Sequence, residues 1–419
     1  MLDFMDYVQH AFYKSSRWNQ DNSYSSLTAT VQSLLDFETP RGLRLKLSSL
    51  PSPNFASSYT IGSVGLVDGS VSYLYSSLPL NVNSRSPELD LHDVVQGYRH
   101  LQDLRKPDDP RWWELWHRGR RIDRRAALLY GRFYLPRSSL EALYLRRISP
   151  TRQLKISCVS DNYIPNGGTL LAVLQEDQGK YSTEYLYSTD SCLLGWRGLY
   201  NFGPDPRDPA VKPESLGAAV SEATLPSSEL YASNNNYGRF SAGAELYYGL
   251  LNKSGGMSTG IRFTTLPRHR SFPYTMTLTL NPLMGNLSST YAVKAGPNLA
   301  MCSRFDFNFY SYESGFQLGC ELWRRQGNRG GGGGGSNGEG GAEVEWAAKK
   351  MTPEWTGNAK RPDDDVSGVL KARVNERWDF GVLWEGRFKE LLFTLGASFD
   401  LKRREQIFRA VGLELQYSS

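Results

Sequence analysis

The sequence predicts an all-β protein, a transmembrane antiparallel β-barrel of well over a dozen strands preceded by a short helical segment. Three observations lead to this prediction. From Arg41 onward apolar and polar residues alternate with a period of two, the apolar stripes are rich in aromatic residues, and charged residues stand at the centres of the predicted strands. A wide barrel with a watery interior accommodates such charges, whereas the core of a soluble sandwich excludes them.

Hydropathy alone does not reveal a membrane protein here. Hydrophobic residues make up 40% of the 419 residues and aromatic residues 12%, and no stretch approaches the roughly 18 apolar residues of a membrane-spanning helix. A membrane barrel gives a much weaker signal per segment than a helix does. Because a soluble sandwich also alternates, a soluble all-β binding or hydrolytic protein remains an alternative.

The first 40 residues are predicted to be helical. Four apolar residues recur at helical spacing within residues 2–13, and Asp3 and Asp6 lie in the first turn, where the helix dipole favours negative charge. A second helix is predicted from about Ser26 to Phe37, ended by Pro40. The four apolar residues are Leu2, Met5, Val8 and Phe12.

The period changes from helical to two at Arg41, and residues 41–419 are assigned to the barrel. Leu43, Leu45 and Leu47 alternate with polar neighbours, and similar runs recur to the C-terminus. Short connections between the last four runs predict antiparallel neighbours. The charged residues expected to face a hydrated interior are Lys46, Arg373, Asp379 and Glu385.

Two polar segments interrupt the alternation, near 82–125 and 326–365. The first contains WWELWHRGRRIDRR and the second GNRGGGGGGSNGEGG. Unpaired backbone in hydrocarbon costs several kcal/mol per group, so both are predicted to be extramembrane inserts. The tryptophan–arginine run is a candidate for docking on anionic headgroups or an acidic partner, the alternative being an ordered loop.

No catalytic, cofactor or metal site is predicted. The five histidines are scattered without metal-ligand spacing, and nucleotide-binding and nucleophile motifs are missing from the sequence. The net charge of +5 is dispersed, which argues against nucleic-acid binding. The cysteines are widely spaced and are predicted to be free thiols; they are Cys158, Cys192, Cys302 and Cys320.

The first residues predict neither a secretory signal nor a mitochondrial transit peptide. They lack a charged region followed by an apolar core, and they carry acids where transit peptides are rich in arginine. A barrel that is not secreted is expected in the outer membrane of an organelle.

Two aromatic pairs are candidates for partner binding. Tyr73 and Tyr75 point to one face of a predicted strand, as do Phe305 and Phe307. Either pair is suited to anchor a partner, because exposed aromatic side chains contribute strongly to interfaces. The alternative is an ordinary lipid-facing belt.

The last strand resembles the insertion signal of organellar barrels, in which a polar residue, a glycine and two apolar residues follow a fixed spacing. Gly412, Leu415 and Tyr417 match this pattern, whereas Ala410 stands at the polar position. The preceding strand carries the full pattern, at Thr394, Gly396, Phe399 and Leu401.

Both ends of the chain resemble one family. The opening MLDFMDYVQHAFYKSSRWNQDNSYSSLTATVQSLLDF and the closing FTLGASFDLKRREQIFRAVGLELQYSS are similar to the fungal mitochondrial distribution and morphology protein 10 family. The resemblance implies a barrel of about nineteen strands, of the same broad kind as the voltage-dependent anion channel. It also implies that the N-terminal helical segment is associated with the lumen.

The resemblance further implies a scaffold of the mitochondrial outer membrane that catalyses nothing. One implied role is membrane anchor of the endoplasmic reticulum–mitochondria encounter structure, which holds lipid-transfer tether proteins. The other is accessory subunit of the sorting and assembly machinery, which inserts barrel proteins and completes the import translocase. Tyr73 and Tyr75 are assigned to the import-machinery face, and Phe305 and Phe307 to the tether face. The alternative function is a metabolite-conducting or protein-conducting pore.

Overall fold

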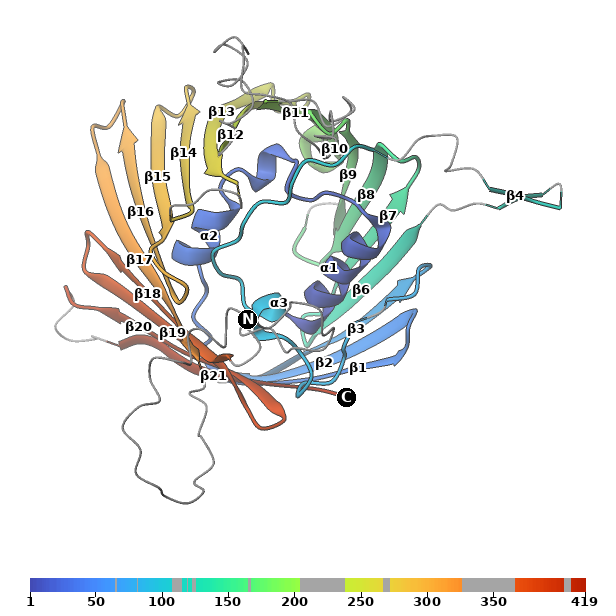
Figure 1. Ribbon diagram of the computed structural model, residues 1–419, viewed down its shortest axis with the longest axis horizontal. Helices are drawn as coiled ribbons and strands as arrows, with labels where there is room; N and C mark the ends of the chain where they lie inside the picture. Colours follow the sequence, from blue (N-terminus) through green and yellow to red (C-terminus); the bar gives the residue numbers. More distant parts are fainter. Residues whose placement is uncertain are drawn as a thin grey trace, which may run out of the picture.

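Nineteen strands form one closed barrel in the computed structural model (Figure 1). The structure describes residues 1–64, 66–80, 82–107, 115–118, 120–122, 126–164, 167–203, 238–266, 272–325, 366–402 and 408–419. Each strand pairs antiparallel with its sequence neighbour in the sheet. Because an odd number of alternating strands leaves the first and last running in the same direction, β1 and β21 close the barrel as a parallel pair.

The strands follow one another in chain order around the wall. The first seven are β1 (Gly42–Ser52), β2 (Phe55–Val64), β3 (Leu66–Ser76), β6 (Ala127–Leu135), β7 (Ser139–Arg147), β8 (Arg152–Ser160) and β9 (Gly168–Asp177). The next six are β10 (Tyr181–Ser188), β11 (Leu193–Phe202), β12 (Gly238–Gly249), β13 (Ser254–Thr265), β14 (Tyr274–Asn281) and β15 (Asn286–Lys294). The last six are β16 (Leu299–Asn308), β17 (Ser314–Arg325), β18 (Val366–Asn375), β19 (Asp379–Phe388), β20 (Leu391–Asp400) and β21 (Phe408–Ser418).

The alternation of side chains confirms the predicted period of two. On β14, Met276 and Leu278 are 46% and 43% exposed on the outer face, whereas Thr275 and Thr277 are 2% and 4% exposed on the inner face. Apolar side chains therefore face outward and polar ones inward, the reverse of a soluble sandwich. Among the described residues, no helix is both long and apolar enough to cross a bilayer.

Short helices lie inside the barrel (Figure 1). They are α1 (Phe4–Ser16), the 3-10 turn η1 (Tyr24–Ser26), α2 (Ala29–Leu35) and α3 (Leu91–Val94); a further 3-10 turn, η3 (Asp190–Cys192), connects β10 to β11. The Asp3 side chain accepts a hydrogen bond from the backbone N–H of Phe4 and so caps α1. The predicted N-terminal helical segment and its place in the lumen are confirmed.

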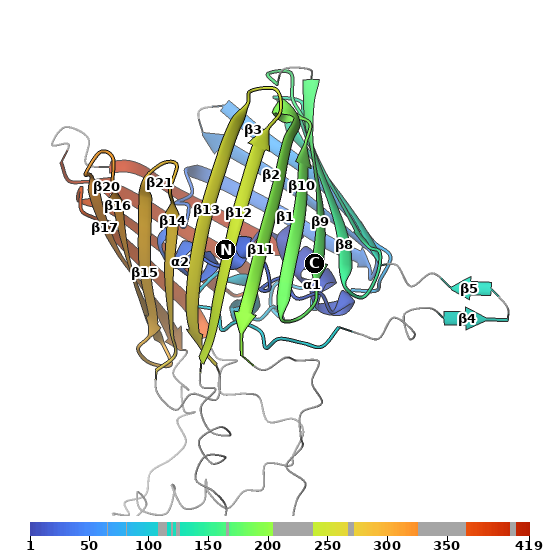
Figure 2. The same cartoon turned by 90° about the horizontal axis from the view of Figure 1, so that it is seen from above.

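The connection from β3 to β6 differs from the extramembrane insert predicted near 82–125. Its described part up to residue 107 crosses the lumen, where Leu89, Leu91 and Val94 are buried against α1. Farther along, β4 (Leu115–His117) and β5 (Arg120–Ile122) form a separate two-stranded sheet (Figure 2). Arg118 is exposed, and the other side chains of the tryptophan–arginine run, like the whole insert at 326–365, lie outside the described residues.

The two rims of the barrel differ in their connections (Figure 2). At one rim, here called the short-turn rim, short turns join β12 to β13, β14 to β15 and β16 to β17. The opposite rim, the long-connection rim, carries the long connections that follow β3, β11 and β17. The four cysteines are free, as predicted.

The parallel seam between β1 and β21 is supported from inside by the residues that lead into β1. Gly42–Ser48 pair with Gly412–Ser418. A Cβ atom at Gly412 would lie 2.4 Å from the carbonyl oxygen of Pro40, and one at Gly396 would lie 2.4 Å from Pro40 Cδ. These two glycines face each other across β20 and β21, so they leave the space that Pro40 occupies.

We expect Gly412→Ala to lower the free energy of unfolding by about 1–3 kcal/mol, because the added methyl group meets backbone atoms that cannot turn away. Urea unfolding in detergent micelles measures the change. Gly315→Ala is the matched control, since nothing lies within 4 Å of a Cβ built there. An equal loss in both variants would contradict a special role for Gly412.

Candidate functional site

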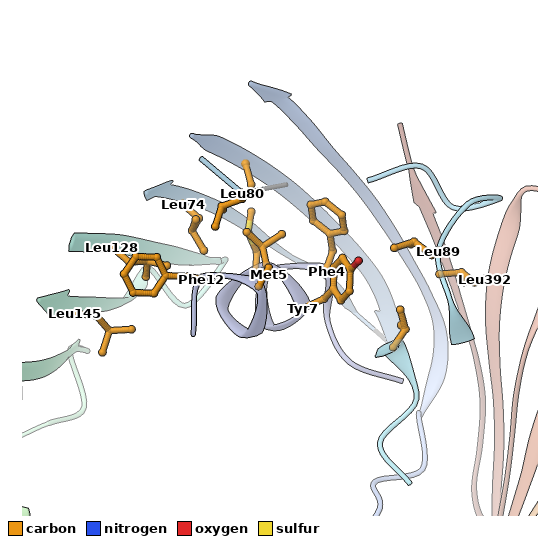
Figure 3. Packing of buried hydrophobic residues seen from close by; sticks show 14 of the residues in the cluster. Phe4, Met5, Tyr7, Phe12, Leu74, Leu80, Leu89, Leu128, Leu145 and Leu392 are labelled. Carbon is orange, nitrogen blue, oxygen red and sulfur yellow. The ribbon is translucent and has the colours of Figure 1, made fainter. Parts of the chain in front are cut away.

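The lumen is the first candidate site, because α1 packs against an apolar patch on its wall (Figure 3). On α1, Met5 and Val8 are fully buried, and Phe4 and Phe12 are each 1% exposed. The wall residues of this cluster point inward, where the barrel pattern expects polar side chains. They are Ala56, Leu74, Leu128, Leu145 and Leu392. Apolar residues at inward positions are the sequence signal for an internal segment, and the expectation of a hydrated interior overlooks this signal.

The other helical turns pack against different parts of the wall. Val31, Leu34 and Leu35 of α2 form a second cluster with Ala292 and Cys302 of β15 and β16. Near η1, Tyr24 and Leu27 pack on Leu199 of β11. Residues 1–40 and 78–107 together fill much of the lumen, and we call these two segments the plug.

Positively charged side chains of the wall bind main-chain carbonyl oxygens of the plug. The arginine bonds are 2.8–3.1 Å long. They join Arg239 to Gln102, Arg262 to Ser26, Lys371 to Gln96, Arg373 to Leu35, and Arg387 to Pro87 and Leu89. Hydrogen bonds from a charged donor are about twice as strong as neutral ones. The wall therefore fixes the path of the plug backbone.

Ion pairs add a second set of links between plug and wall. Asp3 lies 3.8 Å from Lys46 and 3.2 Å from Arg132, and Asp36 binds Arg304 through two bonds of 2.8 and 2.9 Å. Within the wall, Lys46 pairs with Glu414 at 2.5 Å. The pairs of Asp3 are largely buried, so removing one partner leaves an uncompensated charge and is costly. The Asp36 carboxylate is 41% exposed, so its pair with Arg304 contributes less.

The hydrated interior expected for four charged residues is only partly present. Glu385 is fully buried, pairs with Lys371 at 3.1 Å and contacts the amino group of Met1. Lys46 is 7% exposed. Together with Arg373 and Asp379 it lines a cavity of about 950 Å³ between α2 and the seam. The plug thus replaces much of the water that the sequence pattern alone suggests.

The plug also fastens the last strand. The backbone N–H of Ser418 donates to Ser86 Oγ at 2.7 Å, and the backbone N–H of Ser86 donates to the Ser418 carbonyl at 3.1 Å. A cavity of about 520 Å³ remains between α1, α2 and the 78–107 segment. The plug, which continues into β1 and is hydrogen-bonded to β21, therefore narrows the lumen but leaves cavities that are open to solvent.

Burial also sets the ionisation of α1. The pKa of the His10 imidazole is lowered by burial, and its Nδ1 lies 3.0 Å from Gln20 Oε1. Burial raises the pKa of Tyr7 to about 12, and the negative charges of Asp93 and Asp90 add smaller contributions in the same direction. Both side chains are therefore neutral at pH 7 where they pack in the plug.

The second candidate site is the outer face around Tyr73 and Tyr75 of β3, which are 47% and 51% exposed. The Tyr73 ring stacks on Phe55 at 5.9 Å, and its hydroxyl lies 3.3 Å from that of Tyr59. Beside Tyr73 on β6 stands Gly131, so that side of the ring is left uncovered. The pattern within one strand does not reveal Phe55 and Tyr59 as members of this site, because they belong to the neighbouring strand β2.

The third candidate site lies around Phe305 and Phe307 of β16, on the other side of the barrel (Figure 1). Phe305 is 44% exposed and stands opposite Phe316 of β17. Phe307 is half-buried, and its ring meets that of Phe309 edge-on at 5.3 Å. The two predicted aromatic pairs therefore belong to separate clusters, and neither cluster contacts the lumen.

The three residues of the predicted insertion signal lie on β21 but on different faces. Gly412 faces the plug beside Pro40, whereas Tyr417 is exposed on the outer face and Leu415 stands opposite Phe393. Their role in insertion stays a prediction.

Comparison with a protein family and with individual known proteins gives the same result. The family described as "Mitochondrial distribution and morphology protein 10" matches residues 1–338 and 339–419. Proteins of that name from Phaeosphaeria nodorum and Sclerotinia sclerotiorum are 66% and 60% identical to this chain over 419 residues, covering all of both chains. The protein of that name from Podospora anserina is 44% identical, again with full coverage of both.

We expect Val8→Asp to release the plug without unfolding the wall, because a buried carboxylate without a partner costs several kcal/mol. Trypsin cleavage after Lys14 and Arg17 should then become at least about tenfold faster, since cleavage follows the population of the open form. Ser15→Asp, at an exposed position of the same helix, is the control. Circular dichroism checks that strand content is retained, and unchanged cleavage of Val8→Asp would contradict a docked α1.

Proposed function

The chain belongs to the mitochondrial distribution and morphology protein 10 family, and on that premise we propose that it is a scaffold of the mitochondrial outer membrane. In this role it anchors the endoplasmic reticulum–mitochondria encounter structure and assists the sorting and assembly machinery. The family name itself supports a part in mitochondrial distribution and morphology. A barrel fold fits a mitochondrial membrane protein.

The observation that carries the proposal is the plug, which packs on the wall and occupies much of the lumen. A pore for metabolites or unfolded chains needs a continuous water-filled path, whereas here the plug is bound through backbone carbonyls and buried ion pairs. The part of the molecule left free to act is the outer wall and its rims. Position and surface, rather than transport through the lumen, are then what the barrel supplies.

The two aromatic clusters support a scaffold that serves two assemblies. In the proposal, the cluster of Tyr73 and Tyr75 contacts sorting and assembly machinery and import translocase subunits. The cluster of Phe305 and Phe307 contacts the lipid-transfer tether proteins. Because the clusters lie on opposite sides of the barrel (Figure 1), one barrel has room for both kinds of partner.

The proposed tether also accounts for effects on phospholipid exchange and on mitochondrial morphology and inheritance. A protein held in the bilayer by an apolar outer wall keeps soluble lipid-transfer proteins close to membrane lipids, which raises their effective concentration there. No chemical step is required of the barrel itself. In this proposal the whole apolar outer wall contacts membrane lipids.

We expect Tyr73→Ala with Tyr75→Ala to lower recovery of sorting and assembly subunits at least about tenfold, since loss of an aromatic anchor costs 2 kcal/mol or more. Recovery of the tether proteins should stay within about twofold. Affinity purification from mitochondria in mild detergent, followed by mass spectrometry, measures both. The reciprocal variant, Phe305→Ala with Phe307→Ala, is the matched control and should lose tether proteins instead. Equal loss of both assemblies in either variant would show that the pair only supports folding.

Planar bilayers separate the scaffold from the pore. We expect the full-length barrel to show little steady conductance, and the double variant Val8→Asp with Leu35→Asp to conduct at least about tenfold more, because its plug no longer packs on the wall. Ser15→Asp again serves as the control. If the unaltered barrel conducts as well as the double variant, the pore becomes the better description.

A further inference from the structure

Strand β13 has an unpaired edge at the short-turn rim. All twelve residues of β13 pair with β12, from Ser254 to Thr265. On the other side only Thr259–Thr264 pair with β14. The wall therefore steps down between β13 and β14 (Figure 2), and the edge of Ser254–Ser258 is free along this step. Among the described residues, no backbone hydrogen bond from another segment covers it.

From the length of β14 we infer that this free edge reaches into the hydrocarbon. Strand β14 has 8 residues, which at about 3.3 Å each and a tilt near 40° span roughly 20 Å, less than the roughly 25 Å apolar band of such barrels. The turn between β12 and β13 carries the exposed polar residues Asn252 and Lys253, and seven apolar side chains around the step are more than a third exposed. They are Leu246, Tyr248, Leu250, Leu251, Met257, Leu283 and Met284.

An unpaired backbone at this depth requires a partner. Alternate residues of a strand direct their N–H and C=O groups to the same edge, so two or three residues of Ser254–Ser258 have both groups unpaired there. Each such group costs several kcal/mol in lipid, which cannot donate or accept a hydrogen bond in its acyl region. Apolar contact alone leaves this cost in place, whereas an added strand removes it.

We propose that the free edge of β13, Ser254–Ser258, binds an extended segment of a partner protein as an additional β-strand. The segment runs antiparallel to β13, in line with β14, over about five residues. Its outward side chains are apolar, because they continue the lipid-facing band. Opposite Gly255 there is room for a bulky one, since a Cβ built at Gly255 meets only a backbone oxygen, 3.9 Å away.

A second copy of this chain does not fit the edge. In two barrels inserted in the same orientation, both β13 strands start at the short-turn rim. When the two outer faces meet, the strands tilt in opposite directions from the membrane normal, so they cross at about twice the tilt, roughly 70–90°. Neighbouring strands in a sheet differ by about 10–35°. A partner segment arriving from the short-turn side also avoids the long connections, which leave from the opposite rim.

A peptide coupling experiment tests the proposal on the purified full-length barrel. Met257→Cys is introduced after the four native cysteines have been replaced by serine. The probe is the synthetic peptide TLTLN, the last five residues of β14 (277–281), with Leu278→Cys, so that its five residues match Ser254–Ser258. A disulfide forms only when the two Cα atoms come within about 7 Å. Ile261→Cys, on the same outer face but where β13 is paired to β14, is the matched control.

We expect Met257→Cys to couple at least about tenfold more than Ile261→Cys. N-methylation of alternate peptide amides should reduce its coupling to the control level, because the hydrogen bonds of a strand are lost. Equal coupling at both positions, or no effect of N-methylation, would overturn the proposal by showing mere apolar contact. No coupling at Met257→Cys would overturn it as well.

The native complex gives the second readout. In the complex purified from mitochondria in mild detergent, Met257→Cys should be protected from the peptide at least about tenfold relative to the isolated barrel. Unchanged reactivity there would mean that no partner strand occupies the edge, and would also overturn the proposal. Neither readout depends on conductance or on the two aromatic clusters, so the scaffold proposal and this one can fail separately.

Discussion

The need to pair every backbone N–H and C=O group in hydrocarbon is the constraint on which the rest of this structure depends. A closed wall meets it, because each strand has a partner on both sides. With nineteen strands the closure falls on a parallel pair, β1 and β21, which is slightly weaker per residue than an antiparallel one. The neighbouring features support this seam. Pro40 packs behind it against Gly396 and Gly412, and the last strand is tied to Ser86 of the plug.

Closure also separates the side chains of the wall into an outer set and a lumenal set. With apolar side chains outside, the charged ones collect inside, where they need either water or partners. The plug provides the partners. Arg262 and Arg373 bind its carbonyl oxygens, and Lys46 and Arg132 share Asp3. Function follows from this arrangement. A lumen occupied in this way leaves the outer wall and rims for recognition, which is the physical basis of the proposed scaffold with separate aromatic faces.

The rims show where pairing is incomplete. Most backbone N–H and C=O groups of the wall pair with a neighbouring strand, but the step between β13 and β14 leaves a short edge of backbone unpaired. The aromatic clusters and this edge offer different kinds of contact. Tyr73 or Phe305 provide apolar area, whereas the edge of β13 provides directional hydrogen bonds. A scaffold with both kinds of surface can distinguish partners by chemistry as well as by position.

The sequence by itself determined the strand pattern, the outward and inward residues, the N-terminal helices and the free cysteines. These features are local, because the direction of a side chain alternates along a strand whatever its neighbours are. Only the tertiary structure decided what lies in the lumen and which edges are paired. Residues 82–107 appear polar, and polarity does not distinguish a lumenal segment from an external one. The acceptor for Arg262 is the carbonyl of Ser26, and every residue type has a carbonyl. The free edge of β13 arises because β14 pairs with only part of β13. Neither segment, taken alone, reveals this register.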